Sequence, residues 1–282
     1  MAIRIVTDSA SDYTPEEGKK LGITIIPMTL LWDGVEYRDA VDMNNDQFFD
    51  RLVNSSTIPT TSQVSPVAFE SVYEELTANG DQLIVITISS KLSGTCQSAM
   101  IAAEDYEGKV FVVDSLNATV GEHVLIETAM EYIEQGLGIE EIVAKLEYDR
   151  TRIRLLASLD TMEFLKKGGR ISAAVAFAGG LLSIKPVITI EDGAIMLLGK
   201  ARGSKNANNL LRKYVEEMGG IDFRRPFRLI YSGNSDELLQ QYIENSKDMW
   251  ESKVEELPIM RLGAVIGTHI GPGAVGVAFY ES

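Results

Sequence analysis

Short apolar, β-branched runs alternate with amphipathic stretches along the first half of the chain. Residues 3–6, 23–31, 83–88 and 110–114 have the pattern of strands. Helical patterns fill the intervals, beginning with Thr14 and Pro15 as a capped helix start and Gly22 as its end. Further helices are expected at residues 46–53, 66–79 and 122–135 and directly after the turn at residues 89–95. This alternation predicts a mainly parallel, three-layered α/β domain.

The pattern changes after Leu155. A short helix is expected at residues 161–167, closed by Gly168 and Gly169, and a β-hairpin should turn at Asp192-Gly193. Strands are expected at residues 187–190, 195–198, 228–232 and 277–282, and helices at residues 206–218 and 237–254. We therefore expect an α/β fold of two domains, an N-terminal α/β domain at residues 1–155 and a C-terminal α+β domain at residues 156–282.

The most informative stretch is residues 81–103, where a buried strand leads through a hydroxyl-rich turn into an Ala-rich helix. Ser93 would then lie beside the first free amides of the helix, near Gly94 and Thr95. Orphan N–H groups and the helix dipole both favour an anion there. The turn contains no histidine, acid or glycine triad, so it is suited to hold an anion rather than to react with one.

A second hydroxyl-rich turn, at residues 59–63, contains Thr61. Ordinary capping by Ser and Thr explains either turn taken alone. Ligands of parallel sheets bind beyond the carboxyl ends of the strands, so Thr61 and Ser93 could converge on one anion if both turns lie at one sheet edge.

Composition limits the classes of protein. The longest apolar tracts, residues 83–88 and 173–182, are too short to span a bilayer, and the N-terminus begins directly with a strand pattern, so we expect neither a membrane segment nor a signal peptide. The single cysteine, Cys96, fits a reducing cytoplasm. One cysteine and two histidines, His123 and His269, cannot build a structural zinc site, and no metal is expected.

The net charge of −15 lies entirely in the first half, where residues 1–155 hold 11 basic and 26 acidic residues. This charge argues against general nucleic-acid binding. Residues 166–205 nevertheless carry seven basic and two acidic residues, a local balance of +5. Within this window Arg170 follows a glycine pair, which fits either a helix C-cap or a contact with a phosphate or a protein partner.

Catalytic motifs have weak support. The run GPGAVG at residues 271–276 matches a dinucleotide fingerprint, but a terminal strand rather than a helix should follow, which favours a glycine turn. Asp8 follows the first strand, yet Ala10 stands where an aspartate-phosphatase site usually has its second carboxylate, so we expect Asp8 to cap a turn. His269 is expected in a glycine loop, either as a structural residue or as a donor to the same anion.

With these pieces placed, the chain resembles the DegV family of bacterial fatty-acid-binding proteins. The resemblance lies in ten motifs in family order: VTDSASDYTPEE, ITIIPMTL, YRD, PTTSQVSP, ISSKLSGTCQSA, VVDS, LKKGGRIS, IKPVI, GKARG and THIGPGAVG. It implies a two-domain α/β fold that holds a long-chain fatty acid, such as palmitate or oleate, in a tunnel between the domains.

The resemblance further implies that Thr61 and Ser93 bind the carboxylate, with His269 nearby, and that a separate ATP-dependent fatty acid kinase receives the carboxyl group. Residues matching Arg170 and Arg202 are implicated there in presentation or docking, and we expect both on an exposed face near the ligand's carboxylate, in contact with the kinase or its phosphates. His123 departs from the family, where a glycine is common, and could reshape the pocket near Asp114-Ser115.

We therefore expect a cytoplasmic, non-catalytic lipid carrier of fatty acid metabolism, with no catalytic residue and no cofactor besides its fatty acid. A C16 tail contributes roughly 0.8 kcal/mol for each buried methylene, so the hydroxyls and helix-end amides need only satisfy the carboxylate, without a buried countercharge. The alternative is a small enzyme acting on an acyl or phosphoryl group. It is disfavoured because the sequence shows neither a nucleophile–base pair nor a set of metal ligands.

Overall fold

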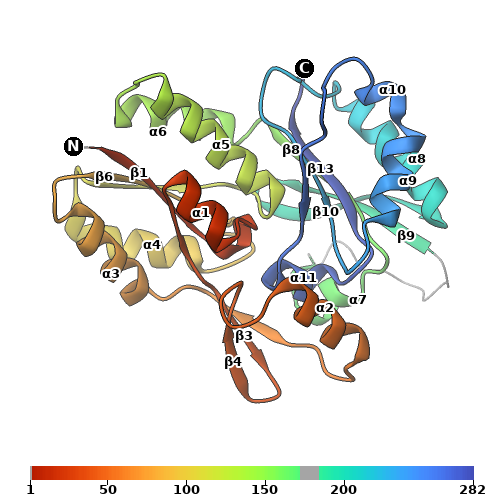
Figure 1. The fold of residues 1–282 in the computed structure, drawn as a ribbon, viewed down its shortest axis with the longest axis horizontal. Helices are drawn as coiled ribbons and strands as arrows, with labels where there is room; N and C mark the ends of the chain where they lie inside the picture. The colour runs from red at the N-terminus through yellow and green to blue at the C-terminus, as the bar shows by residue number, and fades with distance from the viewer. Residues whose placement is uncertain (1, 172–183) are drawn as a thin grey trace.

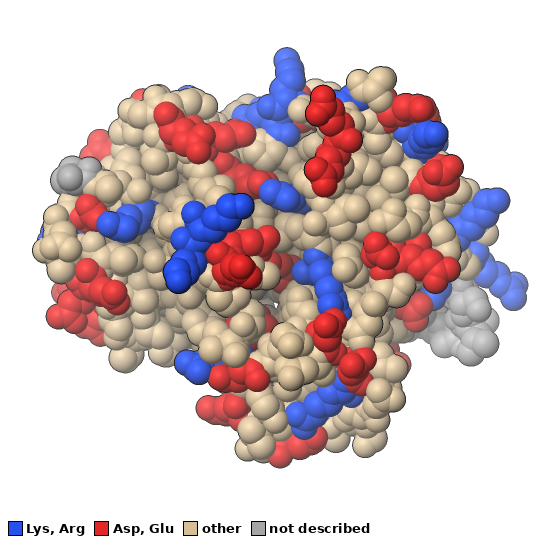
Figure 2. All heavy atoms as spheres, in the orientation of Figure 1, with Lys and Arg blue, Asp and Glu red and all other residues tan. Residues whose placement is uncertain are grey.

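The computed structural model describes residues 2–171 and 184–282, so the apolar tract at residues 173–182 lies outside the described residues. Within the described part, the chain forms three sheets with helices packed against them (Figure 1). No described helix is both long and apolar enough to cross a bilayer. Acidic side chains are spread over the face shown in Figure 2, with basic side chains interspersed among them.

The first sheet is parallel throughout, as the strand–helix alternation predicts, with the order β2-β1-β6-β7. Its strands are β1 (Ile3–Asp8), β2 (Ile23–Ile26), β6 (Gln82–Thr87) and β7 (Val110–Asp114). Helices α3 (Pro66–Thr77) and α4 (Thr95–Ala103) lie on one side, and α5 (Val120–Glu134) and α6 (Ile139–Asp149) on the other (Figure 1). The three-layered arrangement is thus confirmed.

Helix α1 (Pro15–Leu21) begins where the sequence predicts. Thr14 Oγ1 accepts from the Glu17 amide, and the Glu17 carboxylate accepts from the Thr14 amide, which completes a capping box. Gly22 ends the helix in the left-handed region, at φ 72°.

The single strand expected at residues 23–31 is wrong, because the chain leaves the first sheet after β2. Pro27 follows β2 and has no N–H to continue a ladder. Strand β3 (Thr29–Trp32) instead forms a small antiparallel sheet with β4 (Val35–Arg38) and β5 (Thr60–Ser62). The stretch expected as a turn at residues 59–63 is therefore partly a strand, and Thr61 is fixed opposite Leu30.

The third sheet, in the second half, has the order β10-β9-β8-β13-β11-β12 and is antiparallel except between β11 and β12. The expected hairpin turns at Asp192 and Gly193, both with positive φ, but its strands are longer than expected. The strands are β8 (Ile153–Ser158), β9 (Ile184–Glu191), β10 (Ala194–Arg202), β11 (Arg228–Tyr231), β12 (Ile259–Arg261) and β13 (Val275–Tyr280).

The long helix expected at residues 237–254 is two helices, α9 (Glu237–Asn245) and α10 (Lys247–Trp250). They meet at Ser246, which has non-helical dihedrals and whose hydroxyl donates to the Tyr242 carbonyl and accepts from Trp250 Nε1. Side-chain bonding of this kind competes with the helix ladder. The remaining elements are η1 (Ser9–Ser11), α2 (Asn45–Asn54), η2 (Glu104–Tyr106), α7 (Glu163–Lys167), α8 (Ser204–Glu217) and α11 (Ala264–Ile270).

Helix α5 joins the two halves, since it packs on β1 and β6 of the parallel sheet and on β8, β11 and β13 of the large mixed sheet. One hydrophobic core accordingly runs from Ile5 to Tyr280 and includes side chains of both sheets. A second core lies between the mixed sheet and helices α8 to α10. The domain boundary expected at residue 155 falls inside β8, which belongs wholly to the mixed sheet.

Candidate ligand-binding site

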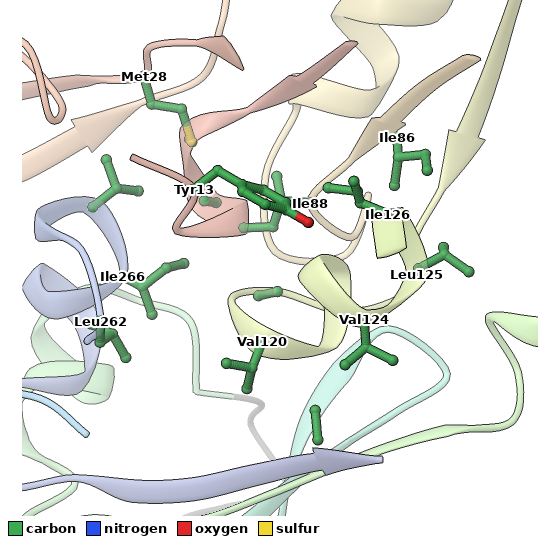
Figure 3. Packing of buried hydrophobic residues seen from close by; sticks show 14 of the residues in the cluster. Tyr13, Met28, Ile86, Ile88, Val120, Val124, Leu125, Ile126, Leu262 and Ile266 are labelled. Atoms are coloured by element: carbon green, nitrogen blue, oxygen red, sulfur yellow. The ribbon is translucent and has the colours of Figure 1, made fainter. Parts of the chain in front are cut away.

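A cavity of about 870 Å³, its mouth included, lies where the two halves meet. Figure 3 shows the surrounding core, with Leu262 and Ile266 on the α11 side, Val120 and Val124 on α5, and Met28 from the N-terminal segment. Aliphatic side chains dominate the cavity wall: Met28, Ile88, Leu92, Leu155, Leu159, Leu165, Ile188, Ile190, Ile195, Ile230, Leu262, Val265, Ile266 and Ile270. The cavity is widened by small residues of β8, β13 and neighbouring segments, namely Ala118, Ala157, Ala274 and Gly276.

The polar side chains of the wall come from both halves. Thr61 of β5 and His269 of α11 are hydrogen-bonded, with 2.8 Å between Thr61 Oγ1 and His269 Nε2. His269 was expected in a glycine loop, but it lies on the last turn of α11, which ends at Gly271 with φ 74°. The helix therefore aims the imidazole at Thr61.

His269 is neutral near pH 7. Burial, and then the charge of Arg170, lower its pKa to about 4. Among the described residues, its buried Nδ1 has no hydrogen-bond partner, so a proton there would leave a donor unpaired. The tautomer with the proton on Nε2 avoids this cost and donates to Thr61 Oγ1. The Thr61 hydroxyl proton is then available to a ligand oxygen.

Ser93 forms the other polar part of the wall. Its Oγ lies 2.9 Å from Thr95 Oγ1 and accepts from the Thr95 amide at 3.3 Å. Thr95 is fully buried and also accepts from the Val64 amide, so it supports Ser93 from behind. Gly94 is the N-cap residue of α4, as the strand–turn–helix pattern predicts.

Gln63 is a cavity-lining residue that the sequence did not single out. Its Nε2 donates to Ser98 Oγ at 2.9 Å, and a Cβ at Gly94 would lie 2.0 Å from its Oε1. The Gln63 amide therefore packs directly against the Gly94 backbone. Thr119, directly before α5, is a second lining residue that the sequence analysis does not identify.

Arg170 differs from its expected place. It is half-buried and lines the cavity, and it donates to the carbonyls of Gly168 (2.7 Å) and Leu92 (3.3 Å). It therefore braces α7 against the turn that carries Ser93. The expectation of an exposed Arg170 is therefore wrong, while its guanidinium stands on the cavity wall as a nearby positive charge. Arg202 is exposed at the end of β10 and is not among the cavity-lining residues.

His123 lies in the core rather than on the cavity wall. Its ring stacks on Tyr13 at 3.6 Å between centroids, and Nδ1 lies 3.2 Å from the Ser11 carbonyl oxygen. Burial, followed by the charge of Arg228, lowers its pKa to about 3. His123 could therefore affect the shape of the pocket only indirectly, through its contacts with Tyr13 and Ser11.

The other motifs have structural roles here. Asp8 caps η1 by accepting from the Ala10 amide, and it also accepts from the Ile88 amide, as expected of a turn cap. In the GPGAVG run, strand β13 follows the glycine turn where a nucleotide fold would require a helix. Within residues 2–171 and 184–282, no group of His, Cys, Asp or Glu is arranged to hold a metal ion.

The family model described as "Uncharacterised protein, DegV family" matches residues 2–282. The chain belongs to the DegV family. A DegV domain-containing protein of Caldanaerobacter subterraneus subsp. tengcongensis is 36% identical over 283 residues, which cover 99% of each chain.

Solved DegV structures share the fold. A DegV family protein from Thermus thermophilus, described as fatty-acid-binding, matches with a TM-score of 0.89 and 35% identity over 100% of both chains. DegV of Bacillus subtilis, described as a fatty acid binding protein, matches with a TM-score of 0.84 and 30% identity over 100% of both chains. A stearic-acid-binding protein from Eubacterium ventriosum matches with a TM-score of 0.85 and 29% identity over 99% of this chain and 97% of its own.

Proposed function

We propose that this protein binds a long-chain fatty acid in the cavity, with the carboxylate at Thr61 and Ser93 and the tail along the aliphatic wall. The observation that carries the proposal is the make-up of the cavity wall. Among the described residues it is mostly aliphatic, and its polar side chains are Thr61, Gln63, Ser93, Thr119, Arg170, Tyr231 and His269. The solved DegV structures described as fatty-acid-binding support the class of ligand.

The tail supplies most of the affinity in this proposal. Burying a methylene contributes about 0.8 kcal/mol, so the 14 or so methylenes of palmitate contribute about 11 kcal/mol before the costs of association. A buried carboxylate without hydrogen bonds would cost several kcal/mol of this, since charged groups are expensive to desolvate. The Thr61 hydroxyl, the Ser93 hydroxyl and the positive field of Arg170 offset that cost.

The direct test is solvent extraction of the purified protein, with mass spectrometry of the extract. We expect long-chain fatty acids in near-stoichiometric amount. Delipidated protein should then take up palmitate or oleate in a titration and bind octanoate far more weakly, because fewer methylenes are buried. A protein that carries no acyl chain and binds none of several lengths would refute the proposal.

We further propose that the protein is a cytoplasmic carrier in fatty acid metabolism and lipid transport, without catalytic residues, which presents the carboxylate to a separate ATP-dependent fatty acid kinase. Arg202 supports this role, because it is exposed, lies in the locally basic window of residues 166–205 and is absent from the cavity wall. Its planar guanidinium suits bidentate contact with carboxylate or phosphate groups on a partner.

Substitutions of Arg202 and Arg170 should have different effects on palmitate binding and on acyl phosphate formation in an assay with a cognate kinase and ATP. Arg202→Ala should leave palmitate binding unchanged but reduce acyl phosphate formation, and the reduction should grow smaller as added salt screens the contact. Arg170→Ala should weaken both palmitate binding and acyl phosphate formation, because it removes the hydrogen bonds to the carbonyls of Leu92 and Gly168. The exposed Arg224 is a matched control, since its partner is the adjacent Asp222. Acyl phosphate made without the kinase would favour the enzyme alternative.

A further inference from the structure

Helix α11 is anchored at its start by two carboxylates from the N-terminal half. Asp12 Oδ1 accepts from the Gly263 amide at 2.9 Å. Asp39 lies beside the same helix start, since a Cβ at Gly263 would be 4.0 Å from Asp39 Oδ2, and the Ala264 and Val265 amides lower its pKa while burial raises it. Both aspartates are almost fully buried. They lie at the helix end where the orphan N–H groups need hydrogen-bond acceptors.

Three glycines fix the helix along its length. A Cβ at Gly263 would lie 2.8 Å from Asp12 Oδ1, one at Gly267 2.7 Å from Phe48 of α2, and one at Gly271 2.3 Å from Phe164 of α7. The spacing of four residues places the three glycines along one side of the helix. Asp12, Phe48 of α2 and Phe164 of α7 therefore approach the backbone at these three positions more closely than a residue with a Cβ would allow there.

The ligand side of the same helix bears Val265, Ile266, His269 and Ile270, all of which line the cavity. His269 is five residues beyond the first residue of α11, Ala264, so the helix carries it about 7.5 Å from the anchored end. Asp12 also accepts from the hydroxyl of Thr119, a second cavity-lining residue, so one carboxylate fixes both parts of the wall.

We infer that Asp12 and Asp39 are positioning residues for carboxylate recognition, acting through α11 on the His269–Thr61 pair. This inference rests on the proposed fatty-acid function. Without the anchor, α11 can slide or tilt within its glycine contacts, and His269 no longer meets Thr61 at hydrogen-bonding distance. The Thr61 hydroxyl then loses its fixed direction, while the aliphatic wall keeps its composition.

The test compares palmitate with hexadecanol, which has the same chain length but no carboxylate. Asp12→Ala and Asp39→Ala should each weaken palmitate binding by about tenfold, the effect of about 1.4 kcal/mol, while hexadecanol affinity changes by less than about threefold. Asp12→Asn should retain palmitate binding because its amide oxygen still accepts from Gly263. Asp42→Ala is the matched control, since Asp42 is bonded to Arg38 near the surface.

Gly263→Ala provides a second route, because its Cβ would displace the Asp12 carboxylate without deleting it. It should reproduce the selective loss of palmitate even if Asp12→Ala fails to fold. Equal losses for both ligands, or no loss for palmitate, would overturn the inference. A wild-type protein that binds neither ligand would instead refute the proposed function itself.

Discussion

At the scale of single residues, the proposed carboxylate site combines the neutral donors Thr61 and Ser93 with the charge of the nearby Arg170. Thr61→Ala or Ser93→Ala removes one hydrogen bond to a charged group, so each should weaken palmitate binding by about 1.5–3 kcal/mol. Titration calorimetry on delipidated protein measures the loss, and thermal unfolding without ligand should stay near the wild-type midpoint. If both variants bind palmitate with wild-type affinity, the carboxylate lies elsewhere.

Because of Asp12, the free energy of unfolding should fall as the pH rises. Burial is the main cause that raises its pKa from 3.8 to about 8, and the neighbouring charges of Asp39 and Asp8 add to it. The folded state therefore favours the protonated carboxyl, and the stability this contributes is lost as the pH rises from about 4 through about 8.

The check is a comparison of wild type with Asp12→Asn, whose amide mimics the protonated carboxyl. The unfolding temperature of the wild type should fall relative to that of Asp12→Asn between pH 6 and pH 9. The two histidines stay neutral in this range because burial lowers both pKa values. Parallel curves over this range would show that Asp12 does not titrate there.

Several residues could be placed from the sequence because their roles are local. Ser93 and Gly94 follow from a strand–turn–helix pattern, and Thr14 from a capping box. Gln63 could not be found in this way, because its position depends on the steric space left by Gly94. Arg170 was misplaced for a similar reason: its acceptors are the Gly168 and Leu92 carbonyls, and the second lies 78 residues away in sequence.

At the scale of elements, β8 forms part of the cavity wall. Ala157 lines the cavity opposite Gly276 of β13 in the sheet register. Ala157→Leu adds three carbon atoms to this wall, which should exclude about three methylenes of a long chain and cost about 2 kcal/mol of palmitate affinity. A competition assay should show weaker binding of palmitate but little change for dodecanoate, which serves as the internal control. Equal loss for both chains would contradict the placement of the tail along β8.

Elements with strong periodic patterns were predictable, and those fixed by distant partners were not. The parallel strands β6 and β7 have continuous apolar runs typical of strands buried on both faces. Helix α11 gave no helical signal, because its sequence AVIGTHI combines a central glycine with β-branched residues. Its helical state depends on contacts with Phe48, Asp12 and Phe164, residues remote in sequence.

At the scale of the whole molecule, α5 and the shared core make independent unfolding of the halves unfavourable. Trp32 and Trp250, the two tryptophans, lie buried in different cores and report on the first and second halves. Trp32→Phe and Trp250→Phe proteins each keep one fluorescence probe. In a urea titration, the fluorescence midpoint of each variant should coincide with the midpoint of the same variant followed by circular dichroism. Separate midpoints would mean that the halves behave as independent domains.

The weak intrinsic helicity of α11 has a consequence for how the protein assembles. A seven-residue segment with an internal glycine does not form a helix alone in water, since short helices are marginal even with better sequences. We therefore expect its amides to become protected only after α2, α7 and the residues around Asp12 have docked. We likewise expect the segment that places His269 to be among the last parts of the chain to become ordered during folding, and among the first to open in the native state. In a refolding experiment, the time at which the α11 amides become protected from hydrogen exchange would then be the time at which the cavity can first hold a ligand.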